Sequence, residues 1–243
     1  MTLLITEDDV KQLPLSVEAA IPVMEETFRQ AGLGTAENPP RVRMSLKRGF
    51  MQFGPVALHA SQIAGFKLWA NFGGGKGVLK SNVGYGHTYL YNMETGELLA
   101  IVQAGHIGRY RTGAVTGVAA KYLSPKHAAT IGIIGCGGIA EGQLEAVCAV
   151  RKIRTVKAYS RSPKNCESFC HRMSERLGVE VVPETTAKAV TCESEIVITA
   201  STSEVPVLSG EPLAKVATTS KPASVRSSQR YCYPVVTMTE NAP

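Results

Sequence analysis

A short run of glycines in the second half of the chain carries the clearest chemistry. Residues 135–140, Gly-Cys-Gly-Gly-Ile-Ala, follow an apolar run and open a helix-type sequence. In a GxGxxA pattern the first glycine permits a tight turn, the second lets the backbone approach a pyrophosphate, and the small last residue lets helix and strand pack closely. A purely structural turn, or a nucleotide-like ligand such as S-adenosylmethionine, fits the same pattern. The pattern favours a dinucleotide, held by Gly135, Gly137, Gly138, Ile139 and Ala140.

The end of the next apolar segment bears on which dinucleotide fits. An NAD site usually places Asp or Glu about 20 residues after the glycines, where the carboxylate binds the ribose 2′-hydroxyl. Here the segment ends in Ser160, Arg161 and Ser162 instead. A guanidinium flanked by hydroxyls suits a 2′-phosphate, so the sequence favours NADP(H) over NAD(H). An Arg161 that is merely solvated would admit either cofactor.

Strand and helix patterns alternate from Ala128 onward, which predicts parallel βαβ units with right-handed crossovers. The expected fold class is therefore α/β, with a Rossmann-type parallel sheet. The expected strands lie near 129–134, 154–159, 179–182 and 195–200, and the expected helices near 138–150, 163–177 and 185–193.

The segment before Ala128 has a mixed, α+β pattern. Thr6 and Ser16 are expected to cap two helices, and Pro22 to kink or restart the second one. Residues 87–102 predict a hairpin. Residues 106–124 predict a helix whose small side chains let it lie close to a neighbour.

Two predicted strands of this first part carry cations. Residues 41–48 alternate strictly, which predicts a half-buried strand with its apolar side chains inside and its cations toward solvent. A second strand is expected around Lys67, whose ammonium would be easier to deprotonate among apolar neighbours. The glycine-rich stretch 73–86 lacks the spacing of a phosphate-binding loop and predicts an ordinary loop or lid. The cationic face comprises Arg41, Arg43, Ser45 and Lys47, and the apolar face Val42, Met44 and Leu46.

Composition narrows the class of protein. The 243 residues are 44% hydrophobic and 19% charged, as in a globular protein, and the net charge of +6 is scattered. This positive charge suits small anionic ligands. The sequence has no strip of aromatic and basic residues, so it does not predict nucleic-acid binding. No apolar run reaches membrane-spanning length. Six cysteines without a CxxC pair indicate free thiols and a cytoplasmic protein, and the spacing of Cys166, Cys170 and His171 does not predict a metal site.

Several stretches together resemble the ornithine cyclodeaminase/mu-crystallin family, which includes alanine dehydrogenases and ketimine reductases. The likeness covers about residues 1–213. It rests on "PPRVRMSL", "GFKLWANF", "METGELLAIVQAGHIGRYRTGAVTGVAAKYLSP", "IGIIGCGGIAEGQLEAVCAVRKIRTVKAYSRSP" and "SEIVITASTSEVPVL".

The resemblance implies roles for single residues. The family's arginine for the substrate carboxylate falls on Arg41, with Arg43 a competing register, and its active-site lysine falls on Lys67. The arginine of its RTGA-like run falls on Arg111, followed by Thr112. Thr199 falls among the cofactor contacts. His87 and His106 are expected near the same pocket, in a structural role or as polar contacts.

The resemblance also implies a reaction and a domain order. The expected function is that of an NAD(P)-dependent oxidoreductase or deaminase that acts on a small amino or imino acid by hydride transfer at the nitrogen-bearing carbon. The ornithine cyclodeaminase, alanine dehydrogenase and ketimine reductase types all fit. A substrate-binding and homodimerisation domain is expected at 1–127, and an incomplete Rossmann domain at 128–213.

The likeness is expected to stop after Leu213. Residues 214–243 are rich in Ser, Thr and Pro, contain one acidic residue, and are expected to form an atypical, disordered tail. The family's catalytic acid then has no counterpart, and the last strand would leave an exposed sheet edge. The alternative function is therefore a catalytically inactive family member that binds only a cofactor or a small acid.

Overall fold

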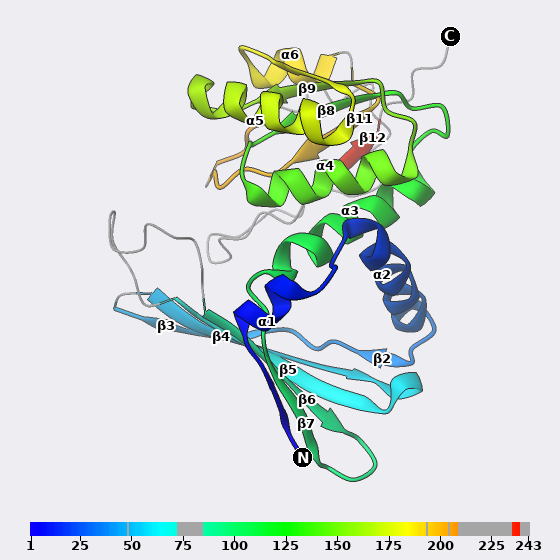
Figure 1. The fold of residues 1–243 in the computed structure, drawn as a ribbon, viewed down its shortest axis with the longest axis vertical. Helices are drawn as coiled ribbons and strands as arrows, with labels where there is room; N and C mark the ends of the chain where they lie inside the picture. The colour runs from blue at the N-terminus through cyan, green and yellow to red at the C-terminus, as the bar shows by residue number, and fades with distance from the viewer. Residues whose placement is uncertain (48, 72–84, 193, 204, 209–234, 239–243) are drawn as a thin grey trace. The chain divides into compact units, whose positions relative to one another are not determined.

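The structure is a computed structural model that describes residues 1–47, 49–71, 85–192, 194–203, 205–208 and 235–238. The chain forms two compact units, Met1–Tyr110 and Arg111–Pro243, each with its own sheet (Figure 1). The division falls within one helix, α3 (Ile107–Leu123). The assignment of functions to residues 1–127, 128–213 and 214–243 stays a prediction.

The second unit contains the expected parallel sheet. Its strands are β8 (Thr130–Ile134), β9 (Thr155–Tyr159), β10 (Glu180–Pro183) and β11 (Ile196–Thr199). They lie in the order β10-β9-β8-β11 and pair in parallel. Strand order therefore reverses at β8, which is the topology of a doubly wound α/β fold. The predicted fold class is confirmed, and the predicted strand positions agree to within about one or two residues.

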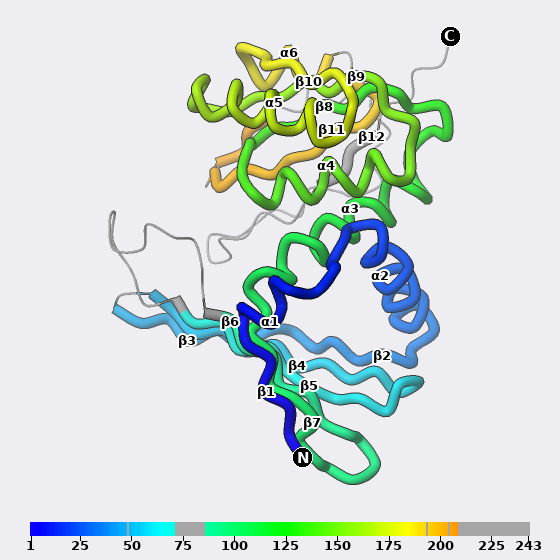
Figure 2. Tube along the Cα trace, viewed as in Figure 1, coloured from blue at the N-terminus to red at the C-terminus, as the bar shows by residue number. Residues whose placement is uncertain are grey.

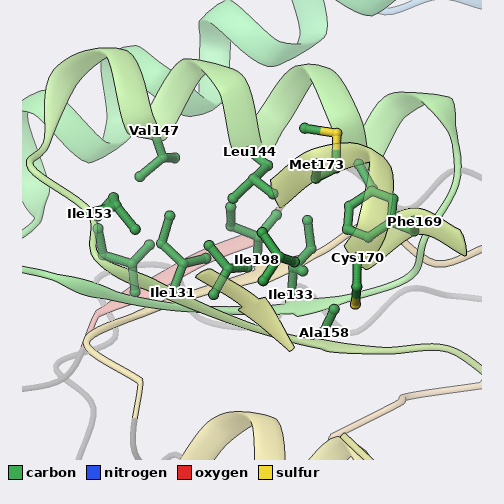
Figure 3. Packing of buried hydrophobic residues seen from close by; sticks show 14 of the residues in the cluster. Ile131, Ile133, Leu144, Val147, Ile153, Ala158, Phe169, Cys170, Met173 and Ile198 are labelled. Atoms are coloured by element: carbon green, nitrogen blue, oxygen red, sulfur yellow. The ribbon is translucent and has the colours of Figure 1, made fainter. Parts of the chain in front are cut away.

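Helices α4 (Gly138–Val150) and α5 (Pro163–Leu177) pack on one face of this sheet. Figure 3 shows Leu144 and Val147 of α4 directed toward the side chains of Ile131 and Ile198. Phe169 of α5 is fully buried in the same cluster. Removing a large apolar side chain of this kind from water stabilises a fold by about 1.5–3 kcal/mol, so this layer anchors the unit.

The opposite face is covered by α6 (Ala187–Cys192). A Cβ placed on Gly132 would lie 2.5 Å from the carbonyl oxygen of Val190, so the helix rests directly on the backbone of β8. Strand β12 (Val235–Met238) pairs antiparallel with β11. The expected exposed edge at β11 is therefore wrong: the predicted tail supplies a fifth strand that takes up its hydrogen bonds.

The first unit holds a second, mostly antiparallel sheet. Its strands run in the order β1-β7-β6-β5-β4-β2, and β3 also pairs with β4. Strand β1, at the start of the chain, runs parallel to β7 about 100 residues later (Figure 2). The strands are β1 (Leu3–Ile5), β2 (Ala36–Glu37), β3 (Val42–Leu46), β4 (Gly49–Leu58), β5 (Ile63–Asn71), β6 (Tyr85–Asn92) and β7 (Leu98–Gln103), with a 3-10 turn, η1 (His59–Ser61), after β4.

Two helices precede most of this sheet. Thr6 and Asp9 form a capping box at α1 (Glu7–Gln12), and the Ser16 hydroxyl accepts a hydrogen bond from Ala19 at α2 (Val17–Gly32). Both predicted caps are confirmed. Helix α2 continues unbroken through Pro22, so the predicted restart does not occur. Within the described residues, no helix is long and apolar enough to cross a bilayer.

Strand β3 lacks the predicted burial of its apolar side chains: Arg43 alone is half-buried, and the other four residues of the strand are exposed. Val42 is 65% exposed and Met44 is 52% exposed. Arg43 is half-buried, with its guanidinium carbon 3.7 Å from the ring centroid of Phe50. The expectation that the apolar residues of this strand lie inside is therefore wrong for the isolated chain, because no described element of this unit covers them.

Arg151 fastens the end of α3. It follows α4, and its guanidinium donates to the carbonyl oxygens of Ala120, Lys121, Ser124 and Pro125 at 2.8–3.1 Å. It also donates to the Ser124 hydroxyl. These carbonyls lie at or just beyond the C-terminus of α3, where helical hydrogen bonds run out. One side chain thus joins the C-terminal ends of α3 and α4.

We expect Arg151→Met to lower the free energy of unfolding of the second unit by about 3 kcal/mol, because several partly buried carbonyls lose a charged donor. Urea denaturation followed by circular dichroism measures the change. The matched control is Arg154→Met, an exposed arginine, which should cost less than about 0.5 kcal/mol. Equal losses in the two variants would contradict this role.

Candidate functional site

The turn after β8 is built around Gly135. Its φ of +106° is a conformation that side chains strongly disfavour. A Cβ at this position would lie 2.4 Å from the carbonyl oxygen of Ala200, just beyond β11. The first glycine of the predicted pattern is therefore required both by backbone conformation and by the close approach of a neighbouring segment.

The rest of the turn presents an open helix N-terminus. Gly137 is the N-cap of α4, and no side chain in the described part of the chain caps the free amides of that helix. Added Cβ atoms at Gly137 or Gly138 would have no neighbour within 4 Å among the residues that the structure describes. Ile139 is exposed, whereas Ala140 is fully buried against the sheet. Free amides at an uncapped helix start form an anion site, so these residues fit the pyrophosphate of a dinucleotide.

The end of β9 lies beside this turn. The Gly135 N–H donates to the carbonyl of Tyr159 at 2.8 Å, and Ser160, Arg161 and Ser162 follow directly. Arg161 is exposed, and its side chain has no hydrogen bond or ion pair among the described residues. The Ser162 hydroxyl accepts from the Asn165 amide as the N-cap of α5. Within the described part of the chain, the predicted cation is therefore available to a ligand next to the glycine turn.

Thr199 completes this edge. It ends β11 and pairs with Ile134, the last residue of β8. In open α/β sheets, ligands bind beyond the carboxyl ends of the strands where strand order reverses. The structure brings the predicted glycines, the serine-arginine segment and Thr199 to that one edge.

Three thiols lie beneath the turn. The Cys136 sulfur is 3.8 Å from the sulfur of Cys166, and Cys170 is buried on the same helix as Cys166. Burial raises the pKa of the Cys136 thiol, and it raises that of Cys170 to about 12. A thiol is nucleophilic only when ionised. The three cysteines therefore pack beneath the turn, and Cys136 and Cys170 are poor nucleophiles at neutral pH.

Arg111 and Thr112 lie early in α3, at the start of the second unit. Arg111 is exposed and Thr112 is half-buried. From Gly113 onward the helix becomes buried. Arg111 is therefore an exposed charged residue just before the buried part of this helix.

In the first unit, Lys67 and Arg41 share one face of the sheet. Lys67 pairs with Gly54 on β4, and cross-strand partners project to the same side. A Cβ on Gly54 would lie 3.5 Å from Cγ of Arg41, so this side chain crosses Gly54 beside Lys67. We call this side the lysine face; it includes Arg41, Arg43, Gly54, Lys67, Trp69, Gly86 and Thr88.

Gly86 makes room on the lysine face. A Cβ there would lie 2.7 Å from the Trp69 ring and 3.0 Å from Cε of Lys67. The Lys67 ammonium lies 5.0 Å from the centroid of that ring. Lys67 is half-buried rather than embedded. Sequence patterns missed Gly54 and Gly86, because their role depends on the register between strands.

The register changes the expectation for His87, whereas the contact of His106 agrees with an expected structural role. His87 pairs with Leu68, so it faces away from Lys67 and does not belong to the lysine face. His106 packs edge-on against Tyr110, with ring centroids 5.5 Å apart. Arg43 is on the lysine face but lies over Phe50. Of the two competing arginines, Arg41 is thus the one beside the strand position of Lys67.

Known proteins resemble most of this chain. An alanine dehydrogenase of Archaeoglobus fulgidus is 34% identical over 210 residues, which are 86% of this chain and 63% of that protein. A solved Δ1-pyrroline-2-carboxylate reductase of Thermococcus litoralis, in complex with NADH and L-proline, is 34% identical with a TM-score of 0.79. It aligns with 87% of this chain, which covers 65% of that structure.

A solved archaeal alanine dehydrogenase dimer with bound NAD is 32% identical, with a TM-score of 0.78 over 87% of this chain and 64% of that one. The chain thus spans less than two thirds of the length of these relatives. The model of the ornithine cyclodeaminase/mu-crystallin family matches residues 1–233, past Leu213, where the likeness was expected to stop. The chain belongs to the ornithine cyclodeaminase/mu-crystallin family.

Proposed function

We propose that this chain carries the substrate and cofactor residues of a nicotinamide-dependent oxidoreductase for a small amino or imino acid. The observation that carries the proposal is the uncapped glycine turn at the edge where strand order reverses. Relatives that are at least 30% identical hold NADH or NAD in their solved structures. Arg161 beside the turn favours NADP(H) as the dinucleotide.

The chemistry is transfer of a hydride at a carbon that bears nitrogen. In the oxidative direction an amine loses that hydride and the nitrogen-bound proton, which leaves an imine; reduction adds both back. A bound nicotinamide supplies the hydride acceptor or donor. The chain must then hold the acid in place and move one proton.

Charged side chains are proposed to bind the acid and to move the proton. Arg111 is exposed at the start of the buried part of α3 and is proposed to bind the substrate carboxylate through charge-assisted hydrogen bonds, with Thr112 beside it. Arg41 is proposed as a further carboxylate contact. Lys67, half-buried beside Trp69, is proposed to exchange the proton at the substrate nitrogen.

The second candidate is a protein that binds a cofactor or small acid without turnover. The observation that favours it is the sequence after Leu213, where no counterpart of the family's catalytic acid can be named. Residues 209–234 lie outside the described part of the structure. Turnover separates the two candidates, because only the first consumes cofactor.

Arg111→Ala should raise KM for the acid about a hundredfold, because a charged carboxylate partner is lost. The cofactor Kd should change less than twofold. The assay follows NAD(P)H absorbance with L-alanine, L-proline and Δ1-pyrroline-2-carboxylate, and Arg154→Ala is the control. Equal loss of acid and cofactor affinity would make Arg111 structural. Cofactor binding without any turnover in the wild type would select the second candidate.

Arg161→Ala should weaken NADPH binding by about tenfold or more and leave NADH binding unchanged, because only NADPH offers a 2′-phosphate. Titration of the reduced cofactors, followed by nicotinamide fluorescence, measures both Kd values. Lys164→Ala, an exposed cation three residues further on, is the control. Tighter binding of NADH than of NADPH by the wild type would overturn the NADP(H) assignment.

We also propose that the first unit forms a homodimer through the side of its sheet opposite the lysine face. This aromatic face is continuous: the ring centroid of Phe66 lies 4.6 Å from that of Tyr89 and 4.9 Å from that of Phe53. Exposed apolar surface of this kind marks interaction sites, and one solved relative is a dimer. The aromatic face consists of Val42, Met44, Leu46, Phe53, Phe66 and Tyr89.

Met44→Asp should raise the dimer dissociation constant at least tenfold, because a charge would be buried at the interface. Analytical ultracentrifugation measures the constant. Val23→Asp, at an exposed valine on α2, is the matched control and should leave the dimer intact. A monomeric wild type, or equal effects of the two substitutions, would reject this interface.

The five described cysteines without disulfides, Cys136, Cys148, Cys166, Cys170 and Cys192, support a reducing compartment, which we propose is the cytoplasm.

A further inference from the structure

Helix α3 lies directly on the backbone of α4. A Cβ placed on Gly113 would be 2.3 Å from the carbonyl oxygen of Gly142 and 3.2 Å from its Cα. Carbon atoms in ordinary contact are about 3.5–4 Å apart. Any side chain at position 113 would therefore push the two helices apart, and the missing side chain sets their separation.

The same contact sets the rotation of α3. Residues two apart on a helix point about 200° away from each other. Gly113 is buried against α4, and Arg111, two residues earlier, is exposed. Seating Gly113 on Gly142 therefore turns Arg111 outward from the helix pair.

A second fastening lies at the other end of the pair. The Arg151 guanidinium, just after α4, binds the carbonyls of Ala120 and Lys121 near the end of α3. The two contacts lie near opposite ends of the helix pair. Together they keep α3 from sliding along α4 and from tilting against it. Helix α4 begins at the glycine turn, so the helix that carries Arg111 and the helix that carries the turn behave as one rigid piece.

We propose that Gly113 is a positioning residue that holds Arg111 at a set place relative to the glycine turn. The inference rests on the proposed function in one respect, since it takes Arg111 as the carboxylate ligand. Misplacing a binding group by about 1 Å can cost two orders of magnitude in rate. Affinity for the acid should therefore depend on residue 113, although this residue does not touch the acid, and affinity for the cofactor should not.

The test compares Gly113→Ala with Gly108→Ala. Both changes add one methyl group to α3, but a Cβ at Gly108 has no described neighbour within 4 Å. Binding of L-proline in the presence of saturating NADH is measured by calorimetry, and NADH binding by fluorescence. Gly113→Ala should raise the L-proline Kd at least tenfold and the NADH Kd less than twofold. Gly108→Ala should leave both values unchanged.

Other results overturn the inference. Equal rises of both Kd values would show general loosening of the unit. An unchanged L-proline Kd would show that the contact of Gly113 with Gly142 does not affect affinity for the acid. If Gly113→Ala does not fold, Arg151→Met tests the second fastening and should raise the L-proline Kd at least threefold, again with unchanged NADH affinity.

The proposed function can fail separately. An Arg111→Ala variant that binds L-proline like the wild type, or a wild type that binds no acid, removes the role of Arg111. Hydrogen exchange then tests separately whether Gly113 sets the packing of α3 on α4. Faster exchange confined to the α3 amides of Gly113→Ala supports the seat on α4, and unchanged exchange overturns it.

Discussion

The candidate cofactor site depends on one residue that has no side chain. Gly135 donates its N–H to Tyr159 at the end of β9, and it packs against the carbonyl of Ala200 beyond β11. It also turns the chain from β8 into α4 with a φ of +106°. The ends of three parallel strands thus meet at one residue, and only glycine permits its φ and its close approach to Ala200. Because Gly135 joins these strand ends, one edge of the sheet carries the free amides of α4, the Arg161 segment and Thr199.

The Cys136 thiol beneath the turn serves the same site by remaining neutral. An anion-binding turn works because partial positive charges face the ligand, and a thiolate at Cys136 would oppose them. Burial among Cys166 and Cys170 raises the pKa of the Cys136 thiol, which keeps it protonated at neutral pH. A small, polarisable and uncharged side chain fills the space below the turn without repelling phosphate.

Local sequence signals predicted most of the helices and strands. The features that they did not predict depend on the pairing of strands that lie far apart in the sequence. Caps at Thr6 and Ser16, and the alternation after Ala128, marked helices and strands correctly. Strand β4 was not predicted, because Gly54 and Pro55 argue against an inner strand. Pro55 falls in the gap between the β3 pairing, which ends at Phe53, and the β2 pairing, which begins at Ala57. Its missing N–H therefore costs no ladder hydrogen bond on that side.

Sequence periodicity alone could not show that the apolar side chains of β3 are exposed in the isolated unit. Alternation shows that the two faces of a strand differ, but the face that is covered depends on neighbours far away in sequence or on another chain. Arg43 finds an aromatic ring on its own sheet, whereas Val42 and Met44 face outward from the isolated unit. In the proposed dimer these apolar side chains would be covered by the second copy. The alternating pattern then describes the assembled protein: the same strand turns its cations toward the lysine face and its apolar residues toward the partner.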